Sequence, residues 1–213
     1  MLRAVFLTGL LLAPLAAAAS PVAFDNSWKE QGFFRFFSSN DYTLQGDRMG
    51  IVSDGTVSII WRPLDSDLGD ASEASWRWQV TQGVIPTDLT KKGGDDRNIA
   101  LYFVFVDAET AKTLNRNSAR RLLRNESTRA LVYVWGGEHK RGTILGSPYS
   151  NALRTKILRG VETGTFNETV DLKSDFRRAF GEEPGVLVGL AITADSDDTD
   201  GVIQAQIGRM VIE

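Results

Sequence analysis

The segments SWRWQV at residues 75–80 and IALYFVFVD at residues 99–107 decide the fold class of this chain. In the first segment Trp76, Trp78 and Val80 alternate with polar residues, so on a strand they project from one face. The second segment is apolar at every position up to Val106, which is typical of a strand that is covered on both faces inside a sheet. The connection at residues 81–98 is long for a hairpin, and such loops are commonly functional or mobile.

Short strands are predicted upstream of this stretch, at residues 42–45, 48–53 and 56–62. The turn dipeptides Gly46-Asp47 and Asp54-Gly55 separate them, and Asp-Gly favours a tight hairpin. Pro63 ends the third strand because proline has no backbone N–H to donate to a neighbouring strand. The aromatic residues at 33–37 are interpreted as a strand or loop edge that closes one end of the core.

Five further strands are predicted downstream, at residues 131–135, 154–158, 165–172, 186–193 and 202–212. One helix is predicted over residues 108–125, where arginines recur every fourth residue on a face that is either solvated or binds a polyanion. A second, short helix is predicted over 175–180, with Ser174 as its cap and Gly181 as its stop. About nine to eleven strands against two helices predict an all-β fold with one or two short helices, a jelly-roll-like β-sandwich.

The composition limits the classes of function. The chain has 213 residues, 42% of them hydrophobic, no cysteine, one histidine and a formal net charge of −3. It is therefore long enough to bury a substantial core, and it contains no disulfide and no zinc site built from several histidines. Because nucleic-acid binders normally carry a basic face, no nucleic acid is expected as a partner.

Residues 1–19 have the order of a secretory signal peptide: a positive charge at Arg3, an apolar run, and small residues that include Ala17 and Ala19. The sequence therefore predicts an exported protein, periplasmic or extracellular, with residues 20–213 as a single β-sandwich domain. No later segment is long and apolar enough to span a bilayer, so no transmembrane segment is expected in the mature chain.

Several motifs follow one another in a characteristic order: Trp76-Arg-Trp78, Lys92-Gly-Gly-Asp95-Asp96, Tyr133-Val-Trp135, Asp175-Phe-Arg-Arg-Ala-Phe-Gly181 and Thr193-Ala-Asp195-Ser-Asp197-Asp198-Thr199. Together they resemble the domain of unknown function 3047 family of exported bacterial proteins, over nearly the whole mature chain. The resemblance implies a β-sandwich similar in kind to jelly-roll carbohydrate-binding modules, and it implies no particular activity. Arg97 departs from the pattern, which would place an aromatic or small residue there.

The acidic loop after the strand at 186–193 contains Asp195, Asp197, Asp198 and Asp200. Like charges this close repel one another unless water or a cation separates them, and calcium takes oxygen ligands from carboxylates. These four residues are the candidate ligands of a structural calcium ion. The alternative is a solvated acidic turn whose side chains bond their own backbone. The loop is not an EF-hand, because Ile207 falls where the bidentate Glu is required.

Six residues are candidates for ligand binding: Arg77, Gln79, Asp95, Asp96, Trp135 and Tyr149. The two carboxylates at the end of the long loop either accept sugar hydroxyls or form structural ion pairs with Arg97, Arg77 or Lys92. Arg77 and Gln79 face away from the tryptophans, where they can line a shallow groove together with Gln204 and Gln206. Trp135 and Tyr149 lie at loop edges and are candidates for stacking on a sugar ring, whereas core packing is expected for Trp76 and Trp78.

Nucleophilic catalysis has little support, because the chain lacks cysteine and a Gly-x-Ser-x-Gly motif. The leading hypothesis is an exported β-sandwich that binds a carbohydrate or other envelope ligand without catalysis. One alternative is a polysaccharide hydrolase or lyase that uses loop carboxylates such as Asp96 and Glu138. Another is a structural envelope protein whose partner is a protein.

Overall fold

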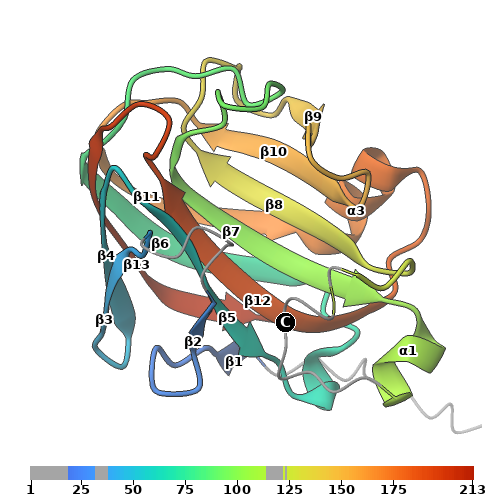
Figure 1. Ribbon diagram of the computed structural model, residues 1–213. Helices are drawn as coiled ribbons and strands as arrows, with labels where there is room; N and C mark the ends of the chain where they lie inside the picture. The colour runs from blue at the N-terminus through green and yellow to red at the C-terminus, as the bar shows by residue number, and fades with distance from the viewer. Residues whose placement is uncertain (1–18, 32–37, 114–121, 123) are drawn as a thin grey trace, which may run out of the picture.

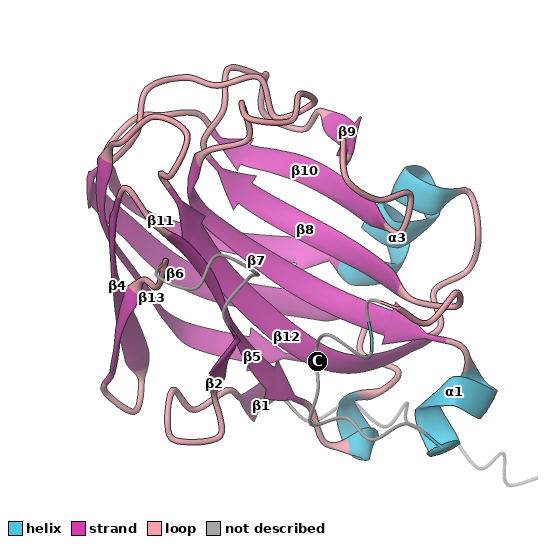
Figure 2. Cartoon of the chain, in the orientation of Figure 1, coloured by secondary structure: helices cyan, strands magenta, loops and turns pink. Residues whose placement is uncertain are grey.

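Two β-sheets pack face to face, as Figure 1 shows for the computed structural model of the protein. The structure describes residues 19–31, 38–113, 122 and 124–213. Strands and the loops between them make up most of this part of the chain, and short helices lie beside the sheets (Figure 2). The predicted fold class, a jelly-roll-like β-sandwich with one or two short helices, is confirmed.

The first sheet has six strands, and every pairing in it is antiparallel. β13 lies near its centre between β6 and β4, and β1 pairs with the end of β13. In order across the sheet the strands are β11 (Gly164–Asp171), β6 (Glu73–Gln82), β13 (Val202–Ile212), β4 (Arg48–Asp54) and β3 (Asp41–Leu44), with β1 (Ser20–Pro21) beside β13.

The second sheet has seven strands, all paired antiparallel except β8 with β10, which run parallel. In order the strands are β2 (Lys29–Gln31), β5 (Val57–Pro63), β12 (Val186–Asp195), β7 (Arg97–Val106), β8 (Arg129–Trp135), β10 (Leu153–Arg159) and β9 (Ile144–Gly146). The α-helices are α1 (Ala108–Thr113) and α3 (Leu172–Phe180), and a 3-10 helix covers Ser66–Leu68.

The main core lies between the two sheets. Trp76 and Trp78 of β6 are buried there, which confirms the core packing predicted from their alternation. Their rings meet edge to face with centroids 5.4 Å apart, and Trp78 also packs at 5.4 Å against Trp135 of β8. β7 lies inside its sheet between β12 and β8, as its apolar sequence predicts.

The outer face of the seven-stranded sheet is also largely apolar. Alternate residues of β7, among them Ala100 and Val104, point away from the main core and pack in two smaller clusters on this face. Tyr102 is the half-buried exception in the middle of β7. Tyr102 thus places a hydroxyl group among the apolar side chains of this face.

The hairpin predicted at Asp54-Gly55 is wrong. Asp54-Gly55 joins β4 to β5, but these strands belong to different sheets, so the turn carries the chain from one layer of the sandwich to the other. Gly55 has φ +59°, a left-handed conformation that glycine adopts at little cost. Residues 83–96 likewise cross between the sheets, from β6 to β7. The other predicted turn, at Gly46-Asp47, does join two antiparallel strands of one sheet, β3 and β4.

The helices differ in extent from the predictions. α3 begins at Leu172, and the side chain of Asp171 caps it by accepting a hydrogen bond of 2.8 Å from the backbone N–H of Ser174. Ser174 therefore lies inside the first turn and is not the cap. Gly181 ends the helix in the left-handed conformation, as predicted. α1 covers Ala108–Thr113, and most of the remaining predicted helix lies outside the described residues.

Two other predictions also fall outside the described residues: nearly all of the signal segment at 1–19, and the aromatic run at 33–37. Within the described part of the chain, no helix has the length and apolar character needed to cross a membrane.

Candidate functional site

A cleft of about 400 Å³ opens on the outer face of the seven-stranded sheet. Its floor comes from neighbouring strands, because Tyr102 of β7 pairs with Val132 of β8, which in turn pairs with Thr155 of β10. These three residues share one face of the sheet, and all of them line the cleft. Strand register therefore fixes a row that is apolar at its centre and carries a hydroxyl group at each end.

Loops form the walls of the cleft. One wall belongs to the connection between β6 and β7 and contributes Leu89 and Asp95. A second wall follows β9 and contributes Pro148 and Tyr149, and a third follows β12 and contributes Asp197. The cleft is thus a rigid sheet surface enclosed by three loops, an arrangement typical of ligand-binding sites.

Arg97, the first residue of β7, organises the charged end of the cleft. Its guanidinium donates hydrogen bonds to Asp195 Oδ2 at 3.1 Å and to the carboxylate and backbone carbonyl of Asp95 at 3.2 and 2.6 Å. It also donates to the hydroxyl of Tyr102 at 3.1 Å and to that of Thr193 at 3.4 Å. With this many acceptors around it, the guanidinium is fixed in one orientation.

Asp195 is the unusual group of the site. Asp195 lines the cleft but is only 6% exposed. Its Oδ1 atom has no hydrogen-bond partner among the described residues. Burial raises the pKa of Asp195 to about 8; Arg97 opposes this rise, and the nearby carboxylates of Asp95, Asp96 and Asp197 add to it. The raised pKa favours the protonated form of this carboxyl near neutral pH. Oδ2 accepts the Arg97 hydrogen bond, which leaves Oδ1 as the oxygen available to hold the proton.

Tyr149 lies in the wall that follows β9, with 57% of its surface exposed. Its hydroxyl donates to Asp95 Oδ1 at 2.9 Å and accepts a hydrogen bond from the backbone N–H of Gly93 at 3.3 Å. The ammonium group of Lys92 lies 5.6 Å from the ring centroid. The hydroxyl is thus held by the neighbouring loop, while the aromatic ring stays accessible at the cleft, where a sugar ring can stack on it.

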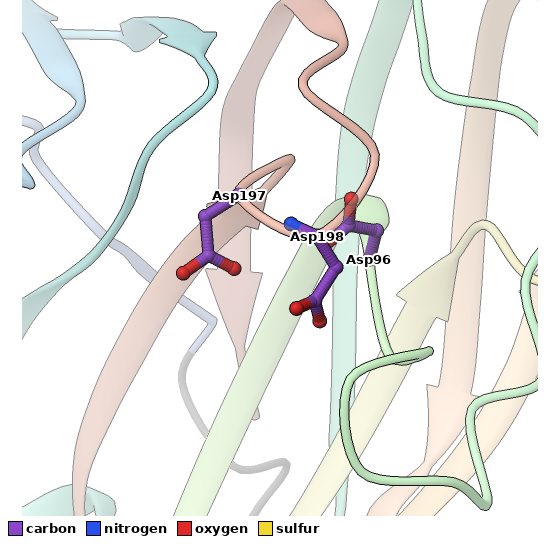
Figure 3. Close-up of side chains that lie close together, drawn as sticks. All are labelled: Asp96, Asp197 and Asp198. Atoms are coloured by element: carbon purple, nitrogen blue, oxygen red, sulfur yellow. The ribbon is translucent and has the colours of Figure 1, made fainter.

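The two acidic loops meet, which the sequence leaves open. Asp96 is fully buried, and its carboxylate accepts hydrogen bonds from the backbone N–H of Thr199 at 2.8 Å, from the Thr199 hydroxyl at 2.6 Å and from the Asp198 N–H at 3.3 Å. Figure 3 shows Asp96 beneath the turn that carries Asp197 and Asp198. Asp96 thus fixes the loop after β12 and, unlike Asp95, does not line the cleft.

The predicted calcium ligands are distributed over three places. Carboxylate oxygens of Asp96, Asp197 and Asp198 lie within 4.8 Å of one another, a spacing that a single cation can bridge (Figure 3). Asp195 is instead paired with Arg97, and Asp200 lies beside Gly55, with φ +50°. The structure thus brings Asp96 into the acidic group in place of Asp195 and Asp200, and calcium binding stays a prediction.

The other predicted ligand residues lie elsewhere. Trp135 is fully buried and faces the core, because the indole N–H donates to the Glu162 carbonyl at 2.8 Å and the ring packs on Trp78; it is therefore not available for stacking on a ligand. Arg77 and Gln79 do share a groove, but on the outer face of the six-stranded sheet, on the other side of the sandwich from the cleft.

Sequence reasoning missed Tyr102 as a residue of the cleft, and it named Arg97 only as an ion-pair partner of Asp95 and Asp96, a pairing that the structure shows for Asp95. Arg97 was noticeable as a departure from the family pattern, directly after two aspartates. Tyr102 carries the only hydroxyl group in the apolar segment 99–106. Neither signal reveals that β12 brings Asp195 opposite Arg97, because that pairing joins residues 98 positions apart.

The family described as "Protein of unknown function (DUF3047)" matches residues 26–211, so the chain belongs to this family, as its motifs indicated. No curated protein matches the chain. Among solved structures it is similar to the xyloglucanase domain of NopAA, a type three effector from Sinorhizobium fredii, at 9% identity and a TM-score of 0.49, with 93% of this chain and 99% of that chain covered.

The family 11 xylanase from Neocallimastix patriciarum is similar at 9% identity and a TM-score of 0.45, over 92% of this chain and 99% of the xylanase chain. A family 29 carbohydrate-binding module from Piromyces equi is similar at 9% identity and a TM-score of 0.39, over 93% of this chain and 91% of the module. At these identities the likeness concerns the fold alone.

Proposed function

We propose that the cleft on the seven-stranded sheet binds a carbohydrate without transforming it. The observation that carries this proposal is Asp195 Oδ1, a buried polar atom without a partner in the wall of an open cleft. An unsatisfied buried polar group costs about 1–3 kcal/mol, which a ligand hydroxyl placed against Oδ1 recovers. Arg97 holds the carboxyl in place, so little ordering accompanies binding.

The remaining lining supports a sugar rather than a wholly apolar ligand. Leu89, Val132 and Pro148 provide apolar surface for the C–H faces of a sugar ring, and Tyr149 offers an exposed aromatic face beside them. Asp95 supplies carboxylate oxygens that accept hydroxyl groups. A few fixed polar groups on a mainly apolar surface are what orient a small ligand.

We also propose that the protein acts outside the cytoplasm, in the periplasm or the extracellular space. This rests on residues 1–19, whose charged, apolar and small-residue regions follow the order of a secretory signal. An export assay with residues 1–19 deleted tests it, and unchanged export would contradict the proposal.

Isothermal titration calorimetry with neutral hexasaccharides of glucose, xylose and mannose tests the binding function. Asp195→Ala should weaken binding at least about tenfold, a loss of about 1.4 kcal/mol. Asp195→Asn should retain most of the affinity, because its amide still donates a hydrogen bond at the same position. Asp65→Ala is the matched control and should change nothing, because Asp65 is an exposed aspartate that does not line the cleft.

Two results would contradict the proposal. One is binding that is equal in the wild type and Asp195→Ala. The other is the absence of glycan binding together with co-purification of one stoichiometric protein partner, which would favour a structural envelope protein.

The raised pKa of Asp195 favours one second candidate function, hydrolysis of a glycosidic bond. A protonated carboxyl can give its proton to the leaving oxygen, while a carboxylate in the same cleft, Asp95 or Asp197, takes a proton from the attacking water. Asp96 and Glu138 do not serve here, because neither lines the cleft. Asp195→Asn separates the two functions: it keeps binding but abolishes release of reducing ends if the protein is a hydrolase.

A further inference from the structure

A second hollow, of about 290 Å³, lies on the outer face of the six-stranded sheet. Arg77 of β6 pairs with Gly208 of β13, which pairs with Arg48 of β4, so the two arginines flank a residue that has no side chain. Arg209 follows Gly208 and lines the same hollow. Three arginines thus line one depression, and Asp47 is the only acidic residue among the described residues that line it.

Two of the three arginine side chains form no hydrogen bond or ion pair within the described part of the protein. Among the described residues, no hydrogen bond or ion pair of the side chain involves Arg77 or Arg209. Arg48 donates to Gln45 Oε1 at 2.7 Å and lies 3.5 Å from the exposed carboxylate of Asp47. Because arginine offers a fork of donors that matches carboxylates, free guanidinium groups at one hollow are suited to bind an anion.

The backbone at Arg209 is strained. This residue has φ +51°, which residues other than glycine rarely adopt, and the pairing of β13 with β6 is irregular between Gly208 and Val211. The Arg209 N–H donates to the Asp47 carbonyl at 2.9 Å, which holds the irregularity in place. Strained residues concentrate at functional sites, and here the irregularity aims an additional arginine at the hollow.

The hollow continues along the sheet. Gln79 pairs with Gln206 across β6 and β13, and both line the arginine hollow as well as an adjoining one of about 220 Å³. Gln204 and Thr81 line the adjoining hollow, so amide and hydroxyl groups follow one another away from the arginines. The strip therefore offers anion-binding groups at one end and hydrogen-bonding groups for uncharged hydroxyls along its length.

We propose that this strip binds an acidic polysaccharide, with arginines holding its carboxylates and glutamines its hydroxyls. Its ligand differs from that of the cleft, and it lies on the other outer face of the sandwich. The two proposals are therefore independent: Asp195→Ala weakens binding in the cleft and leaves binding at the strip unchanged.

Calorimetry with polygalacturonate, with uncharged dextran and with free galacturonate tests the proposal. The wild type should bind polygalacturonate with an affinity that falls as salt is added, whereas any dextran bound in the cleft should neither depend on salt nor change in the arginine variants. Arg77→Gln combined with Arg209→Gln should lower the affinity at least tenfold. Arg178→Gln is the matched control, because Arg178 is an exposed arginine of α3 far from the strip in the sequence and in a different element.

Thermal melting confirms that the double variant folds, and Arg77→Gln alone replaces it if the melt is altered. Absence of polygalacturonate binding by the wild type overturns the proposal. Equal losses in the double variant and in Arg178→Gln also overturn it, because they indicate a general charge effect. Free galacturonate that binds as tightly as the polymer overturns the assignment to a polysaccharide and leaves a simple anion site.

Discussion

Replacing Asp195 by asparagine should change how the stability of the protein depends on pH. In the unfolded chain the carboxyl has its ordinary pKa of 3.8, whereas in the folded protein burial raises the pKa to about 8. Between about pH 4 and pH 8 the folded protein therefore holds a proton that the unfolded chain releases. The stability from this proton is fully present below the lower pKa and is lost as the pH rises through the upper one.

The magnitude follows from the two pKa values. A difference of about four units, at about 1.4 kcal/mol each, gives a loss of stability on the order of 5 kcal/mol across the window. The exposed carboxyl of Asp107 does not obscure this loss. Hydrogen bonds from Thr110 and Ser127 lower its pKa to about 2, so it titrates below the window.

Urea unfolding followed by tryptophan fluorescence at about pH 5 and pH 9 measures the effect. The wild type should lose several kcal/mol of unfolding free energy between the two conditions, and Asp195→Asn should lose much less, because an amide does not titrate. Asp65→Asn is the matched control, since Asp65 is exposed and its carboxylate makes no hydrogen bond or ion pair within the described residues. Equal losses in the wild type and Asp195→Asn would show that Asp195 is ionised in the folded protein, and that the cleft has no protonated donor.

Three further substitutions test the fold. Gly189→Ala places a Cβ atom 2.0 Å from the Trp61 ring and should destabilise the protein by about 1–3 kcal/mol in urea unfolding; an unchanged midpoint would contradict this packing. Trp78→Ala empties a site that is 0% exposed and should cost about 3–5 kcal/mol in the same assay. Asp171→Ala removes the cap of α3 and should cost about 1 kcal/mol, whereas Ser174→Ala should cost clearly less; the reverse order would restore Ser174 as the cap.

Local patterns predicted the elements well where the strand alternation is clear. The final strand, β13, has the predicted bounds Val202–Ile212, because apolar and polar residues alternate directly after the acidic loop. Trp78 was placed in the core for the same reason. The prediction that Trp135 is exposed was wrong. A residue beside two glycines at the end of a strand can be exposed or buried, and only the packing of Trp135 against Trp78 determines that it is buried.

The arrangement of elements was less accessible to sequence reasoning. An Asp-Gly dipeptide specifies a tight turn, but it does not specify which sheet the next strand joins, so Asp54-Gly55 was assigned to a hairpin. The candidate site was missed for the same reason, because it depends on which strands pair. Asp195 and Arg97 each lie at the end of an apolar strand, and only the pairing of β12 with β7 makes them one group.

An NMR titration of the backbone amides with the tightest-binding neutral hexasaccharide tests the central claim most directly. We predict that the shift changes concentrate at the cleft, around Tyr102, Tyr149, Thr155 and Asp195, and that Asp195→Ala needs at least about tenfold more ligand to reach the same changes. Shift changes that instead follow Gln79 and the other strands of the six-stranded sheet would contradict the claim that the cleft is the carbohydrate-binding site.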